Sequence, residues 1–275
     1  MKLIVESGAT KSTWVLLDRG EIYDKKVLEG INPTSNPTSV KYVDRFDSRG
    51  KDQVKEVHFY GAGVSSPVAI DLLSGSIRKN FDCDIINLEH DILAAARSVS
   101  DGSPSIVSIL GTGTNTVVYD GSQIVKSFKA LGYLFGDYGS GFHIGKELLR
   151  AYFTGAMSRA DEERFAERHV RGQDDLLFRI YDSERPNFET AKLSRFLEIA
   201  SAELKDKILN HCFESFFHNQ IMHISECSEL PLRFVGSIAA VFRDELTKCA
   251  VKHGLNIDVI EGNPIDGLIA YHNKN

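Results

Sequence analysis

Two segments of the chain, about 100 residues apart, share one plan that restricts the possible folds more than any other feature. Residues 3–17 contain two β-favouring apolar runs around a polar turn, and residues 105–119 repeat that order around a glycine- and threonine-rich turn. Apolar runs on either side of a short polar turn are typical of β-hairpins. The repeat therefore predicts a duplicated α/β architecture with a nucleotide held between the halves.

The first turn has residues suited to phosphate. Gly8 permits close approach of the backbone, Thr10 offers a hydroxyl and Lys11 a cation. Successive backbone N–H groups in a turn form an anion-binding nest, and a neighbouring carboxylate such as Glu6 can hold a magnesium ion or its waters. Considered alone, the first turn is better explained as part of an ordinary N-terminal hairpin, and the second copy of the plan is what favours the phosphate site.

Composition excludes several classes of protein. The 275 residues are 42% hydrophobic and 25% charged, with a net charge of −6, as in a globular protein large enough for two domains. The acidic balance disfavours a nucleic-acid-binding groove. No apolar run reaches membrane-spanning length, and no basic leader precedes the first strand, so we expect no membrane partner and a cytoplasmic protein.

The cysteines and histidines show no metal-binding spacing. The four cysteines lie far apart without a CxxC pair, and the nine histidines form no HxH or HExxH motif. We therefore expect reduced cysteines that pack in the interior rather than a protein-built metal site.

Apolar periodicity gives the remaining elements. It predicts strands at residues 3–5, 14–17, 22–28, 54–60, 83–88, 105–110, 117–119, 124–125, 231–235 and 257–261. It predicts helices at residues 40–46, 68–80, 92–97, 142–152, 192–207, 208–226, 239–253 and 264–272, and a charged, helix-rich segment at residues 158–180. In the helix 68–80, Ile70, Leu73 and Ile77 are expected on one face, and the phenylalanines of residues 208–226 are expected in the core.

Three further segments suggest a ligand site. Asp91 lies between a predicted strand and an alanine-rich helix, where it is either an N-cap or a carboxylate directed at a ligand, and the two roles are compatible. Glycines surround Asp137 in residues 132–141, as in a loop that lies close to a ligand. Gly236 and Ser237 join a strand to a helix and could seat an adenosine or its α-phosphate.

Taken in order, these motifs resemble a known superfamily. Residues 6–12 (ESGATKS) and 111–115 (GTGTN) resemble the two phosphate motifs of the actin/hexokinase/Hsp70 ATPases, and residues 235–239 (VGSIA) resemble their adenosine motif. Residues 131–141 (LGYLFGDYGSG) and 263–268 (NPIDGL) are similar to signatures of the N-acetylglucosamine kinase family, grouped with the BadF/BadG/BcrA/BcrD ATPases. The resemblance extends over nearly the whole chain.

The resemblance implies an ATP- and Mg²⁺-dependent kinase that phosphorylates the C6 hydroxyl of an amino sugar such as N-acetylglucosamine. Two ribonuclease-H-like lobes with an interlobe cleft are implied: residues 1–101, with 264–275 packing back on them, and residues 102–262. It makes Asp91 the catalytic base and Glu6 the magnesium carboxylate. The implied ATP-binding residues are Gly8, Ala9, Thr10, Lys11, Gly111, Thr112, Gly113, Gly236 and Ser237. The implied sugar-binding residues are Asn32, Thr114, Asn115, Gly132 and Asp137. A homodimer is plausible for the family.

Two departures from the family leave alternatives open. Tyr138 stands where the family usually has Glu, and Glu6 where many members have Asp. The loss of a carboxylate at Tyr138 makes the choice of amino sugar uncertain and is the main support for a sugar or nucleotide sensor with weakened catalysis. A BadF-type ATPase that activates a partner enzyme is the other alternative, although such activators hold an iron–sulfur cluster through clustered cysteines.

Overall fold

The computed structural model of the chain describes residues 1–8, 11–170 and 175–274. It divides into two compact units. Unit 1 comprises Met1–Asp101, Gly121–Gln123 and Pro264–Asn275, and unit 2 comprises Gly102–Asp120 and Ile124–Asn263.

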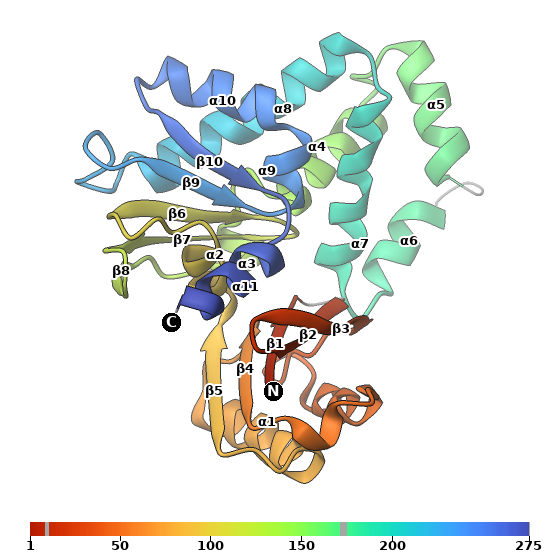
Figure 1. Cartoon of the computed structure of the whole chain (residues 1–275). Coiled ribbons are helices and arrows are strands. Elements are labelled where there is room, and N and C mark those ends of the chain that lie inside the picture. Colours follow the sequence, from red (N-terminus) through yellow and green to blue (C-terminus); the bar gives the residue numbers. More distant parts are fainter. Residues whose placement is uncertain (9–10, 171–174, 275) are drawn as a thin grey trace. The chain divides into compact units, whose positions relative to one another are not determined.

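Within the described residues, unit 1 contains a five-stranded sheet (Figure 1). Its strands are β1 (Lys2–Ser7), β2 (Lys11–Asp18), β3 (Glu21–Glu29), β4 (Glu56–Gly61) and β5 (Ile85–His90), in the spatial order β3-β2-β1-β4-β5. The first three strands pair antiparallel, whereas β4 runs parallel to β1 and β5 parallel to β4. Strands β1, β4 and β5 therefore end at the same edge of the sheet.

Helices cover this sheet and complete its core. They are α1 (Pro67–Asn80), α2 (Asp91–Ser98), α11 (Ile265–Lys274) and the 3₁₀ segments η1 (Pro37–Arg45) and η2 (Lys51–Gln53). On one side Trp14 stacks on Phe46, with ring centroids 5.1 Å apart. The C-terminal helix α11 packs on α2 and β1, and its Ile265 and Leu268 are buried in a cluster with Ala94.

Unit 2 repeats the sheet of unit 1. Its described strands are β6 (Ser105–Leu110), β7 (Thr114–Tyr119), β8 (Ile124–Ser127), β9 (Leu232–Val235) and β10 (Ile257–Glu261), in the order β10-β9-β6-β7-β8. Again three antiparallel strands are followed by two parallel ones. The predicted duplicated α/β architecture is confirmed, because the same hairpin plan opens both sheets.

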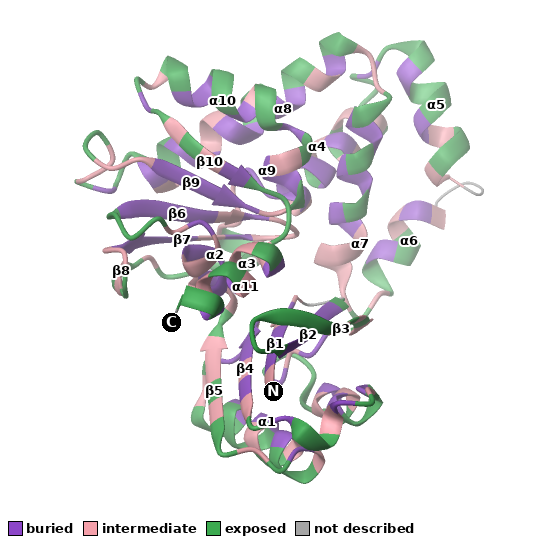
Figure 2. Cartoon of the chain, in the orientation of Figure 1, coloured by how far each residue is buried: buried purple, intermediate pink, exposed green. Residues whose placement is uncertain are grey.

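The helices of unit 2 each have a buried side and an exposed side, and the buried sides pack against the sheet or against other helices (Figure 2). They are α3 (Gly132–Phe135), α4 (Gly141–Phe153), α5 (Arg159–His169), α6 (Asp175–Tyr181), α7 (Pro186–Lys192), η3 (Leu193–Glu198), α8 (Ala202–Phe216), η4 (Phe217–Ile221), α9 (Ser237–Val241) and α10 (Arg243–Lys252). Phe213, Phe216 and Phe217 are fully buried, which confirms their predicted place in the core.

Three predicted helices of unit 2 have the wrong bounds. Residues 192–207 hold η3 and then a new start at α8, because the Ser201 hydroxyl caps α8 by accepting a hydrogen bond from the Leu204 backbone N–H. Residues 208–226 end as α-helix at Phe216 and continue as the π-helical turn η4. The helix expected at 239–253 is interrupted at the buried Phe242, which separates α9 from α10.

Two predictions for unit 1 also need correction. Ile70 is 38% exposed, and the buried face of α1 is formed by Ala69, Leu73 and Ile77, which follow one another at four-residue intervals. The helix expected at residues 40–46 is the 3₁₀ segment η1, which begins at Pro37.

The four cysteines lie within the described ranges and are free; Cys212 and Cys249 pack in the interior as expected, whereas Cys83 and Cys227 are only partly buried. Among the described helices, none is both long and apolar enough to cross a lipid bilayer.

Candidate functional site

The carboxyl edge of the unit 1 sheet brings Glu6 and Asp91 together. Glu6 pairs in register with Tyr60 on β4, and Gly61 at the end of β4 pairs with His90 at the end of β5. Asp91 follows directly as the first residue of α2. Because β1, β4 and β5 are parallel, residues 85 positions apart in the chain reach one edge of the sheet.

Burial dominates the electrostatics of this pair. It raises the pKa of Glu6 to about 7, with a further increase from the charge of Asp91 and a smaller opposing effect from Lys11. Burial also raises the pKa of Asp91, although the backbone N–H groups of Ile92 and Asp91 stabilise its carboxylate. Oxygen ligands and uncompensated negative charge fit a magnesium ion, which would restore the ionised form of Glu6.

The N-cap role considered for Asp91 is wrong. His90 is the N-cap residue of α2, makes no side-chain capping bond, and leaves Asp91 at the first helical position. The Asp91 carboxyl therefore interacts with N–H groups of the first turn without being the N-cap, and its remaining acceptor capacity can serve a ligand.

The first phosphate turn is only partly described. Gly8 donates its backbone N–H to the Lys11 carbonyl over 3.0 Å, which closes the turn between β1 and β2, and the Lys11 side chain is exposed. Ala9 and Thr10, two of the expected ATP-binding residues, lie outside the described residues.

Asn32 is fixed beside the end of β1 by a residue that sequence reasoning did not single out. The fully buried Ser7 hydroxyl donates to the Ile31 carbonyl over 3.0 Å and accepts from the Ile31 N–H over 2.7 Å. Asn32 Oδ1 accepts from the Ser35 N–H, and a Cβ on Gly63 would stand 2.0 Å from this oxygen. Among the described residues Asn32 Nδ2 has no hydrogen-bond partner, so it can donate to a ligand.

In unit 2 the second phosphate turn is anchored to the start of α4. The Gly111 N–H donates to the Gly113 carbonyl over 3.0 Å, which tightens the turn. The Gly111 carbonyl accepts from Gly141 over 2.8 Å, and the Thr112 carbonyl accepts from Phe142 over 3.1 Å. The turn therefore keeps its shape through backbone contacts with residues about 30 positions later.

Asp137 belongs to the same group. Its Oδ1 accepts the Thr114 N–H over 3.0 Å, and a Cβ on Gly113 would stand 2.7 Å from its Oδ2. Asp137 has a positive φ of 53°, a conformation that aspartate tolerates better than most residues. Burial raises the pKa of its carboxyl, and the Thr114 bonds oppose that rise.

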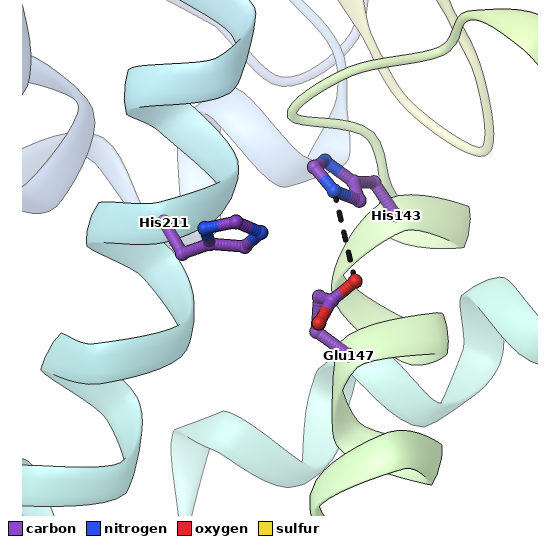
Figure 3. Close-up of side chains that lie close together, drawn as sticks. All are labelled: His143, Glu147 and His211. Carbon is purple, nitrogen blue, oxygen red and sulfur yellow. Dashed lines mark ion pairs between the residues drawn. The ribbon is translucent and has the colours of Figure 1, made fainter.

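His143, which the sequence analysis did not single out, supports the Asp137 loop (residues 132–141) through a hydrogen bond. The Gly139 N–H donates to His143 Nδ1 over 3.1 Å, so the proton of the neutral ring lies on Nε2, the atom directed at Glu147 in Figure 3. Burial lowers the pKa of His143 to about 4 and keeps the ring neutral. The edge of this ring also meets the half-buried Tyr138. A histidine directly after a glycine-rich loop is the only signal that the sequence offered.

The remaining predicted site residues also lie in unit 2. Gly236 has a φ of 127° and approaches β6 so tightly that a Cβ would stand 2.4 Å from the Leu110 carbonyl oxygen. Ser237 is exposed at the start of α9, which is only five residues long. Asn115 lies on β7, where its Oδ1 accepts the Thr116 N–H, and Gly132 is exposed at the start of α3 with open space around it.

Comparisons with known proteins agree with this architecture. No protein-family model and no curated protein sequence matches the chain. A candidate N-acetylglucosamine kinase from Porphyromonas gingivalis has a solved structure that is 30% identical, with a TM-score of 0.92 over 100% of this chain and 99% of its own.

More distant structures share the fold. A candidate N-acetylglucosamine kinase from Chromobacterium violaceum is 16% identical, with a TM-score of 0.75 over 98% of both chains. A ROK-family glucokinase from Streptomyces griseus, solved with glucose and AMPPNP, is 14% identical, with a TM-score of 0.62 over 98% of this chain and 97% of its own. The two sheets thus form the actin-like ATPase and sugar kinase fold, and the chain belongs to the same family as the N-acetylglucosamine kinase candidate from P. gingivalis.

Proposed function

We propose that this protein is an ATP-dependent kinase that transfers a phosphoryl group to the C6 hydroxyl of an amino sugar such as N-acetylglucosamine. The observation that carries the proposal is the half-buried pair Glu6 and Asp91 at the carboxyl edge of the unit 1 sheet, in a chain of this family. Both candidate kinases from P. gingivalis and C. violaceum support the amino sugar as substrate.

Asp91 is the proposed general base. It accepts the proton of the attacking hydroxyl as the oxygen bonds to phosphorus, and its burial-raised pKa brings it nearer to the range in which a carboxylate accepts protons efficiently. Glu6 is the proposed holder of magnesium, directly or through water, and the ion would neutralise charge on the transferred phosphoryl group.

The two glycine turns are the proposed nucleotide contacts. Gly8 and Lys11 belong to the first turn, and Gly111, Thr112 and Gly113 to the second, where the small glycines let the backbone approach phosphate oxygens closely. Gly236 and Ser237 are the proposed adenosine contacts. The AMPPNP bound to the S. griseus glucokinase, which shares the fold, supports nucleotide binding.

Several polar groups are the proposed sugar contacts. The Nδ2 group of Asn32 can donate to a sugar oxygen, and Asp137 can accept from a hydroxyl while it holds Thr114. Asn115 and Gly132 complete the proposed set. Tyr138, in place of the family's usual Glu, replaces an acceptor with a phenol, so we expect a sugar preference that differs from that of relatives with Glu.

The test is ADP release by the whole protein with magnesium-ATP against a panel of hexoses and N-acetylhexosamines. Release that requires one N-acetylhexosamine, with a 6-phosphate product found by mass spectrometry and NMR, supports the proposal. Release without sugar would favour the activator ATPase. ATP binding without release under any condition would favour the sensor and make Tyr138→Glu the next variant to assay.

A further inference from the structure

Two groups of three potential metal ligands occur among the described residues, and both lie in unit 2. The first, His143, Glu147 and His211, is drawn in Figure 3. Its key histidine cannot bind a metal as it stands, because Nδ1 accepts the Gly139 N–H and the proton must lie on Nε2, the nitrogen nearer the other two residues. A metal there would disrupt the hydrogen bond that supports the Asp137 loop.

The second group consists of Glu214, Cys249 and His253, and it connects two helices. Glu214 lies on α8, Cys249 on α10, and His253 directly after α10, four positions beyond Cys249 and thus on the same side of the helix. Helices α8 and α10 lie side by side over β9 and β10 (Figure 1). Cys249 is fully buried, whereas the side chains of His253 and Glu214 are 22% and 41% exposed, so an ion has a route from solvent.

The three side chains already converge. His253 Nε2 lies 2.7 Å from Glu214 Oε2, and the Cys249 thiol lies close enough to the same carboxylate for its charge to act on the thiol. The three ligand atoms lie within 4.8 Å of one another. Bonds of about 2.0–2.3 Å around a tetrahedral zinc ion place ligand atoms about 3.3–3.8 Å apart, so side-chain adjustments of about 1 Å suffice.

Neighbouring groups hold the imidazole in place. The His253 ring stacks on Phe217, with centroids 5.5 Å apart and an interplanar angle of 26°. Nε2 of His253 points at the Glu214 carboxylate. In contrast to His143, whose Nδ1 accepts a backbone N–H, Nδ1 of His253 has no backbone donor in the described chain. The ring can therefore carry its proton on Nδ1 and present the Nε2 lone pair to an ion. Lys252 Nζ, 3.5 Å from Glu214 Oε1, is a cation that an ion would displace, and its side chain is 54% exposed.

We propose that Glu214, Cys249 and His253 bind one zinc ion that joins α8 to α10, with water as the fourth ligand. Thiolate sulfur, imidazole nitrogen and carboxylate oxygen form a donor set that zinc favours. Binding releases the thiol proton to solvent, while the imidazole binds through Nε2 and keeps one proton on Nδ1. Burial, assisted by the charge of Glu214, raises the pKa of the Cys249 thiol to about 12, so zinc affinity increases with pH.

The proposed ion would reinforce the helix behind the Asp137 loop. Phe216, two residues after Glu214 on α8, lies so close to Gly139 that a Cβ there would stand 2.8 Å from Phe216 Cβ. Tying α8 to α10 therefore limits movement of the helix on which this loop rests. The zinc site itself does not depend on the identity of the sugar or on kinase activity.

Metal binding by the whole protein tests the proposal. The chelator-treated protein is dialysed against zinc and its metal content is measured, and cobalt is then titrated as a spectroscopic substitute. We expect one zinc per chain and a thiolate-to-cobalt charge-transfer band. We expect Cys249→Ala and His253→Gln each to weaken zinc binding by at least about 10–100-fold, the loss typical of even indirect ligand partners.

Two variants serve as controls. Cys212→Ala removes the other buried cysteine of this helix pair, and His211→Gln removes a ligand of the first group, so both should bind zinc as the unmodified protein does. Because His253 is partly exposed, His253→Gln should fold even if Cys249→Ala does not. Absence of stoichiometric zinc, a cobalt spectrum without a thiolate band, or loss of zinc in His211→Gln but not in His253→Gln would overturn the proposal.

Discussion

Glu6 and Asp91 lie close enough together at the carboxyl edge of the unit 1 sheet for the charge of Asp91 to raise the pKa of Glu6. Glu6 ends one strand of the sheet and Asp91 begins the helix that follows another. The protein thus holds two carboxyl groups where their charges oppose each other, an arrangement that costs stability and that a bound cation relieves.

Glu6→Gln should stabilise the ligand-free protein at pH 8. The folded state holds the Glu6 proton more tightly than the unfolded chain, with a pKa of about 7 against 4.5, so stability is lost as the pH rises from 4.5 through 7. At pH 8 the gain on removing the charge should be on the order of 2–3 kcal/mol, and near pH 4.5 it should vanish. Urea unfolding at both pH values measures it, with the exposed Glu21→Gln as control. An equal effect at both pH values would contradict the raised pKa of the Glu6 carboxyl.

Asp91→Asn should keep the fold and ATP binding but reduce turnover by about two to four orders of magnitude, because the amide cannot accept the proton of the hydroxyl. Little stability should be lost, because the amide oxygen of Asn can still accept from the first-turn N–H groups that Asp91 accepts. Steady-state kinetics and nucleotide titration measure the two effects. Asp71→Asn, on the exposed side of α1 in the same unit, is the matched control. Full turnover in Asp91→Asn would rule out this residue as the base.

His143→Leu should lower kcat/KM by about tenfold, because the Gly139 N–H loses its acceptor and the Asp137 loop loses about 1–3 kcal/mol of support. His143→Asn should recover most of the loss, since the amide oxygen can take the place of Nδ1. Kinetics of the two variants, with thermal unfolding alongside, separate loop support from general packing. The role as acceptor would be wrong if both variants were impaired equally.

Gly113→Ala should weaken nucleotide and sugar binding without unfolding unit 2. The new Cβ would meet Asp137 Oδ2 at 2.7 Å and displace the side chain that holds Thr114. Gly75→Ala is a suitable comparison, because its Cβ meets nothing within 4 Å in the middle of α1 and should add up to about 1 kcal/mol of stability. Calorimetric titration of both variants with ATP and sugar measures the affinities. Unchanged affinities in Gly113→Ala would show that the bond between Asp137 and Thr114 does not contribute to binding.

Local patterns explain why most strands were predictable. An apolar run, a turn of small residues and a second run specify a hairpin without any distant partner, and both units open with this plan. Helix boundaries in unit 2 were harder. Ser201 begins α8 through a capping bond, and the buried Phe242 separates α9 from α10. Neither residue interrupts the apolar periodicity of the sequence.

For the candidate site, the sequence named the residue types and tertiary contacts assigned their partners. The bond between Thr114 and Asp137 spans 23 positions, and the Ser7 hydroxyl reaches 24 positions to fix Ile31 beside Asn32. His143 could not be found from spacing alone, because its importance depends on the nearby Gly139 N–H and on a burial that lowers its pKa.

The sequence by itself determined the duplicated sheets, the glycine turns and the placement of Asp91 between a strand and a helix, because each depends on neighbours within a few residues. Only the tertiary structure decided which distant groups meet. It brought Glu6 to Asp91, and it brought Cys249 and His253 to Glu214, 35 and 39 positions earlier, although no cysteine or histidine motif marks that group. The reason is physical: strand order and helix packing set distances between residues that the order of the chain leaves free.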